Sequence, residues 1–117
     1  MMARISAEEV ANIVGLTADE LSKPCDDSII PSLANCFTEW RVIFESLLSD
    51  LDLDDVDKEN ATEEEKGIAA LRKWKARNNS EATYKVLVGV LLKKGERYLA
   101  ESLCKILADH LSCEYGM

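Results

Sequence analysis

The chain has 117 residues, of which 47% are hydrophobic and 31% are charged, and its formal net charge is −8. This length and balance predict one globular domain built around a single core, and they exclude a disordered chain. The longest apolar run, residues 86–92, is too short to cross a bilayer, so we expect no membrane insertion.

Few residues could take part in catalysis or metal binding, and they lie far apart in the sequence. The N-terminus lacks the hydrophobic region of a secretory signal. Four cysteines, Cys25, Cys36, Cys104 and Cys113, are spaced too widely for a structural zinc site, and we expect reduced thiols in a helical core. The chain has one histidine, His110, and it has no glycine-rich phosphate loop. The sequence therefore contains no motif that indicates a catalytic site. We expect a cytoplasmic protein that is not an enzyme and that uses no cofactor, metal or small-molecule substrate.

The first 24 residues predict one or two short helices. Two capping boxes, in which a Ser or Thr is followed three residues later by Glu, mark their starts: Ser6 with Glu9, and Thr17 with Glu20. The spacing of apolar residues in 8–21 is similar to that of a DNA-binding helix-turn-helix, but its second helix would carry acidic residues and would end at Pro24. We therefore expect a helical extension or a linker over residues 1–24, and no nucleic acid as a partner.

Six helices are predicted from residue 27 onward. The first covers Ile29 to Phe37 and tolerates Pro31 because it lies in the first turn. The second follows a cap at Thr38, and its apolar residues from Trp40 to Leu51 recur at three- and four-residue steps, as on one buried helical face. The acidic residues 51–59 form the third, short helix.

The last three helices have clearer signals. A capping box of Thr62 with Glu65 begins the fourth helix. The apolar stripe of this helix includes Trp74, and the helix is expected to end near residues 78–79. Ser80 is expected to cap the fifth helix, and Gly95 to end it. The sixth ends near residue 110. Strand alternation is absent, so the sequence predicts an all-α antiparallel bundle.

Five aspartates lie between residues 50 and 57, and a calcium loop is the first alternative to weigh. A loop that starts at Asp50 needs glycine at its sixth position and glutamate at its twelfth, where the chain has Asp55 and Ala61. The interleaved Leu53 and Val56 argue against a disordered acidic run. A surface for a protein partner is the interpretation that remains.

Charge is segregated along the chain. Residues 45–65 contain ten acidic side chains and one basic one, whereas residues 66–97 contain nine basic and two acidic ones. If the two blocks form separate faces, the acidic face of one copy can meet the basic face of another. We expect one docking face at Asp52, Asp54, Asp55 and Glu59, and its complement at Arg72, Lys73, Lys75 and Arg77.

The order of elements from Asp27 to Leu107 resembles a death domain. The resemblance rests on the sequence Leu71-Arg72-Lys73-Trp74, on residues 80–84 at the start of the fifth helix, and on residues 95–101 with Leu103 in the sixth. It implies a six-helix antiparallel Greek-key bundle of the death-fold type over residues 25–112, with residues 113–117 as a tail.

The resemblance also implies a function. Death domains are non-catalytic modules that assemble with other death domains, by homotypic or heterotypic contacts, in apoptotic and innate-immune signalling. Self-association and an adaptor role in the cytoplasm are therefore expected. A second face is implied where the fourth helix ends and the fifth helix turns into the sixth: Arg77, Asn78, Lys94, Gly95 and Glu96. The alternative is a structural or docking domain of a larger scaffold protein that does not oligomerise.

Overall fold

The computed structural model describes residues 6–37 and 39–115, and it gives side-chain surroundings as far as Ser112. All regular structure in these residues is helical, with eight α-helices, three short 3-10 helices and no strand. The predicted all-α class is therefore confirmed. The chain forms two compact units, of which unit 1 contains residues up to 23 and from 83 onward, and unit 2 contains residues 24–82.

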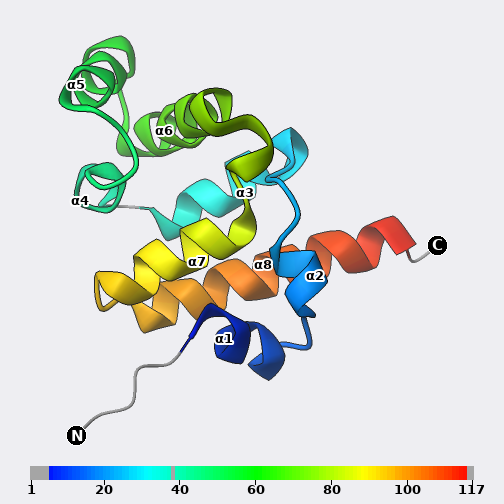
Figure 1. The fold of residues 1–117 in the computed structure, drawn as a ribbon. Helices are drawn as coiled ribbons and strands as arrows, with labels where there is room; N and C mark the ends of the chain where they lie inside the picture. Colours follow the sequence, from blue (N-terminus) through cyan, green and yellow to red (C-terminus); the bar gives the residue numbers. More distant parts are fainter. Residues whose placement is uncertain (1–5, 38, 116–117) are drawn as a thin grey trace, which may run out of the picture. The chain divides into compact units, whose positions relative to one another are not determined.

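Unit 1 is built from the two ends of the chain. It contains α1 (Ala7–Ile13), α2 (Ala18–Leu21), α7 (Tyr84–Lys93) and α8 (Arg97–Tyr115). Helices α7 and α8 lie side by side, and α1 packs against both (Figure 1). Val10 of α1 is fully buried, as are Leu87 of α7 and Leu103 of α8. Helix α1 is thus part of a core with α7 and α8.

Unit 2 is organised around one long helix. It contains η1 (Asp27–Ile29), α3 (Ile30–Leu33), η2 (Ala34–Cys36), α4 (Trp40–Phe44), α5 (Asp50–Glu59), α6 (Glu63–Asn78) and η3 (Asn79–Glu81). The elements α3, η2, α4 and α5 all contact α6 (Figure 1). The rings of Phe37 and Phe44 have centroids 5.3 Å apart and help to fill this core.

Several helix boundaries agree with the capping signals in the sequence. The capping boxes at Ser6, Thr17 and Thr62 are all formed, with both reciprocal hydrogen bonds present in each. The acidic helix forms at Asp50–Glu59 behind an N-cap at Ser49, and Gly95 adopts a φ of 80° after α7. Six α-helices follow residue 27 in the described chain, and two short ones precede it, as predicted.

Two predicted helices are shorter than their apolar patterns suggested. The stretch expected as one helix over residues 29–37 is instead η1, α3 and η2 in succession. The next helix, α4, ends at Phe44 rather than running to Leu51. Its expected cap, Thr38, lies outside the described residues. Because Ser49 starts a new helix, Leu51 turns outward and is 76% exposed, so its predicted burial was wrong.

Two boundaries near the C-terminus also differ from the prediction. Thr83, not Ser80, caps α7, because Ser80 lies inside η3. Helix α8 runs to Tyr115, so residues 113–115 are helical rather than part of a tail.

No helix within residues 6–37 and 39–115 has both the length and the apolar character needed to pass through a bilayer.

Both tryptophans lie in the core of unit 2, as their positions on apolar stripes predicted. Trp74 of α6 is 2% exposed and Trp40 of α4 is 3% exposed. The Trp40 indole Nε1 donates to Glu63 Oε2 at 2.8 Å, which satisfies its polar atom at the edge of the core. The two side chains therefore anchor α4 and α6 in the same core.

Replacing Trp74 by Ala should lower the free energy of unfolding by about 3 to 5 kcal/mol, because the change leaves a large cavity in a packed interior. Urea denaturation followed by circular dichroism measures the change. The matched control is Leu51→Ala, which removes an exposed side chain and should change stability by less than about 0.5 kcal/mol. Equal effects of the two substitutions would contradict the assigned burial.

Asn79 has an unusual backbone conformation at the end of α6. Its φ of 51° and ψ of −117° are typical of the first central residue of a type II′ turn, a position that favours glycine. It is the one non-glycine residue with positive φ in the described chain. A residue with a Cβ atom, such as Asn79, is therefore strained in this backbone conformation.

Asn79→Gly should raise the free energy of unfolding by about 1 kcal/mol, because relief of this strain exceeds the added freedom of the unfolded chain. Thermal and urea denaturation measure the gain. Asn79→Ala keeps the steric penalty and should bring no gain. A glycine variant less stable than the parent would show that the turn has another conformation.

Candidate protein-interaction surface

Helices α5 and α6 are joined by ion pairs in antiparallel order. We call this set the charge ladder: Asp52 with Arg77, Asp55 with Lys73, and Asp57 with Lys66. The nitrogen–oxygen distances are 2.6 Å, 3.8 Å and 2.8 Å respectively. As residue numbers rise along α5, those of the partners fall along α6, so the two helices run in opposite directions at this contact.

The spacing of the basic residues explains why α6 can form the ladder. Lys66, Lys73 and Arg77 are separated by seven and then four residues, and such steps place side chains on one helical face. On α5, Leu53 and Val56 are buried, and the ladder aspartates flank them. Apolar packing therefore orients α5 so that its acidic residues lie over the basic face of α6.

Asp52 and Arg77 form the closest pair of the ladder. The arginine donates from Nε to Oδ2 at 2.9 Å and from Nη2 to Oδ1 at 2.6 Å, which is the bidentate geometry of strong carboxylate pairs. The Asp52 side chain is 5% exposed, and Asp52 is the one buried charged residue of the described chain. The Arg77 hydrogen bonds hold the pKa of this carboxyl below its ordinary value, against the effect of burial.

Arg41 of α4 adds contacts that the sequence did not reveal. Its Nη2 donates to Asp54 Oδ1 at 2.9 Å, and its Nη1 lies 4.0 Å from Asp57 Oδ2. These contacts and the neighbouring carboxylates raise the pKa of Arg41. Arg41 lies before the acidic block in the sequence, and its partners are 13 and 16 residues further along the chain, so no local signal marked it.

The structure revises the idea of two separate docking faces on these helices. Asp52 and Asp55, expected on the acidic face, pair with Arg77 and Lys73 of the expected basic face. Asp54 is paired with Arg41 in the same unit. The expectation that the two groups lie apart was wrong, because apolar packing brings α5 onto α6. Asp52 is also too buried to contact a partner directly.

Of the eight charged residues expected on the first docking face and its complement, two stay exposed and form no ion pair in the described chain. They are Glu59 in the last turn of α5 and Arg72 of α6. Arg72 lies on a different face of α6 from the ladder, since it immediately precedes Lys73 in the helix. No described side chain of opposite charge pairs with either residue, so a partner protein could do so.

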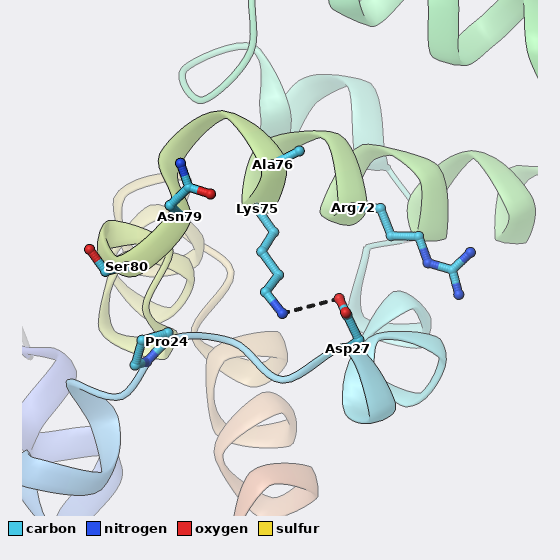
Figure 2. Close-up of a pocket in the computed structure, with 7 residues that line it drawn as sticks. All are labelled: Pro24, Asp27, Arg72, Lys75, Ala76, Asn79 and Ser80. Atoms are coloured by element: carbon cyan, nitrogen blue, oxygen red, sulfur yellow. Dashed lines mark hydrogen bonds and ion pairs between the residues drawn. The ribbon is translucent and has the colours of Figure 1, made fainter.

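Lys75 lies on the Arg72 side of α6. Its Nζ donates to Asp27 Oδ1 at 3.1 Å across a shallow pocket of about 430 Å³ in unit 2 (Figure 2). The pocket is lined by Pro24, Asp27, Arg72, Lys75, Ala76, Asn79 and Ser80. Sequence patterns could not reveal this pair, because its members are 48 residues apart.

The second expected face is divided between the units. Arg77 and Asn78 belong to unit 2, whereas Lys94 and Glu96 belong to unit 1. Asn78 Nδ2 donates to the Trp74 carbonyl at 2.8 Å and so satisfies a backbone group near the end of α6. The combined face stays a prediction.

The thiols whose surroundings are described are buried: Cys25, Cys36 and Cys104. Burial raises the pKa of Cys25 to about 12 and that of Cys36 to about 11. Both thiols are therefore protonated at neutral pH, and a protonated thiol is a weak nucleophile. The prediction of core cysteines is confirmed for these three. The Cys113 side chain lies outside the described part.

A comparison of the chain with models of protein families, with curated proteins and with solved structures finds no match.

Asp52→Asn should lower the midpoint of thermal unfolding by several degrees at pH 7. The folded-state pKa of Asp52 lies below its ordinary value of 3.8. The contribution of the ionised Asp52 to the free energy of unfolding is therefore fully present above pH 3.8, and it is lost as the pH falls through the folded-state pKa. The difference between wild type and variant should therefore shrink below about pH 4.

Thermal unfolding at pH 7 and at pH 3 tests this expectation. Asp54→Asn is the matched control, because Asp54 and its partner Arg41 are about half exposed and their pair is more strongly screened by water. It should destabilise the protein less. An Asp52→Asn variant as stable as the parent at pH 7 would contradict the pairing of the buried Asp52 with Arg77.

Proposed function

We propose that this chain is a non-catalytic protein-interaction module of the death-domain type, which assembles with other copies of itself or with related domains in intracellular signalling. The Greek-key death fold over residues 25–112 is part of this proposal. It is supported by the six α-helices after residue 27, by the short acidic helix α5 before the long α6, and by the buried tryptophans of α4 and α6.

The observation that carries the proposal is the outward side of α5. Leu51 is 76% exposed, and the helical positions three, four and seven residues later hold Asp54, Asp55 and Lys58. A large apolar side chain ringed by charged ones is a composition that suits a small protein contact. Glu59 ends the same helix as an exposed carboxylate that forms no ion pair with the residues that the structure describes.

The proposed contact is heterologous, with different surfaces on the two partners. Glu59 and Leu51 of one copy face Arg72 of the next copy, and each copy keeps both surfaces, so the contact can repeat. Single exposed ion pairs bind weakly, and the resulting association is weak and sensitive to salt. The charge ladder serves here to hold α5 in place.

A second candidate function is a structural or docking domain of a larger scaffold, which does not oligomerise. The observation that favours it is the internal pairing of Asp52, Asp54, Asp55, Lys73, Lys75 and Arg77. Charges that are satisfied within the molecule contribute little to assembly. The two functions differ in whether association depends on concentration.

Sedimentation velocity over a range of protein concentrations separates the two candidates. Glu59→Lys and Arg72→Glu should each weaken self-association by about 5-fold or more, because each places like charges against one another. The double variant Glu59→Lys/Arg72→Glu restores opposite charges at the contact and should recover most of the lost association. This recovery is specific to a contact between these two positions.

The control is Lys105→Glu, which reverses an exposed basic residue of α8 in unit 1 and should leave association unchanged. Circular dichroism checks that all variants keep their helical content. A wild-type protein that stays monomeric at every concentration and at low salt would reject self-assembly and favour the scaffold function.

A further inference from the structure

The pocket beside Asp27 combines two basic groups with neutral polar ones on one side of α6. Arg72 and Lys75 are three residues apart, which makes their side chains neighbours on the helix surface. Ala76 and Pro24 are the apolar part of the lining. Asn79 and Ser80, which follow α6, add an amide and a hydroxyl.

The charge of the pocket is only partly balanced within the protein. Figure 2 shows Lys75 extending from α6 to Asp27, while the Arg72 guanidinium lies outside this pair. Arg72 forms no ion pair with any described residue, whereas Lys75 has one. Two positive charges and one negative charge therefore leave a net charge of about +1 at the pocket, in a chain whose formal net charge is −8.

We propose that this pocket binds a phosphate monoester, with Arg72 and Lys75 as its two cationic contacts. The Arg guanidinium presents donors in a fork that matches the oxygens of a phosphate, and the Lys ammonium adds a second charge. This inference goes beyond the proposed interaction function and does not rest on it, because a monomer can bind phosphate.

The charge of the ligand decides between a phosphate and a carboxylate. An incoming carboxylate has the same charge as Asp27, so it gains little by taking the place of Asp27 at Lys75. A phosphate monoester carries about −1.5 to −2 at pH 7 and can neutralise Arg72 and Lys75 together. The Asp27 side chain is 78% exposed, so it can turn into water when the phosphate takes its place.

Asp27 is therefore an internal competitor for the site. This role makes an unusual prediction, namely that removal of an acidic side chain tightens anion binding. Asp27→Asn should strengthen phosphate binding by about 2- to 5-fold, which is the range expected for loss of an exposed ion pair. Arg72→Gln should weaken phosphate binding by about 10-fold or more, because this substitution removes the charged guanidinium and its paired N–H donors.

The test is a titration of ¹⁵N-labelled protein at pH 7.5 with inorganic phosphate, followed by NMR. Two short peptides without other charged side chains and with blocked ends, one with a single phosphoserine and one with glutamate at that position, are titrated in parallel. Backbone amide signals from residues 72–80 should shift with phosphate and with the phosphopeptide, but far less with the glutamate peptide. Tighter binding of the phosphopeptide than of inorganic phosphate would identify a phosphorylated protein as the source, and equal binding would identify a small free phosphate.

Lys73→Gln is the matched control, since Lys73 lies next to Arg72 in sequence but pairs with Asp55 on the ladder face. It should leave phosphate binding unchanged within about 2-fold, as expected for a charge outside the site. The proposal would be overturned by shifts that avoid residues 72–80, by equal binding of the glutamate peptide, or by an Arg72→Gln variant that binds phosphate as well as the wild type does.

Discussion

The ion pair between the buried Asp52 and the exposed Arg77 is the constraint on which the surface of unit 2 depends. A carboxylate that is 5% exposed is costly unless it is paired and hydrogen-bonded, and the bidentate arginine supplies both. The pair fixes the register between α5 and α6. Once Asp52 meets Arg77, the antiparallel course of the helices brings Asp55 to Lys73 and Asp57 to Lys66.

This register also determines which side chains are left for binding. The ladder uses one face of α6, and the Asp27 pair uses Lys75 on another face, so Arg72 remains the exposed cation between them. On α5, burial of Leu53 and Val56 turns Leu51 outward and leaves Glu59 exposed. The surface proposed for assembly and the pocket proposed for phosphate follow from the same packing of α5 on α6.

Local signals predicted more of the structure than apolar periodicity did. The capping boxes at Ser6, Thr17 and Thr62 act within four residues, and each formed where the sequence placed it. The prediction of one helix from Trp40 to Leu51 was wrong because the three- and four-residue spacing of apolar residues continues past Ser49, although Ser49 caps a new helix there. Charge blocks were visible in the sequence, but their pairing was not, because the partners Asp52 and Arg77 are 25 residues apart and meet only through packing of the intervening core.

The most direct measurement of this arrangement is an NMR titration of the Asp52 carboxyl carbon in dilute protein, with and without Arg77→Gln. If the pair forms within one molecule, the midpoint in the wild type lies below 3.8 at every protein concentration and rises in the variant. A wild-type midpoint at the ordinary value, unchanged by Arg77→Gln, would contradict the pair and the register built on it. A low midpoint that appears only in concentrated protein would show that Asp52 is neutralised by another copy instead.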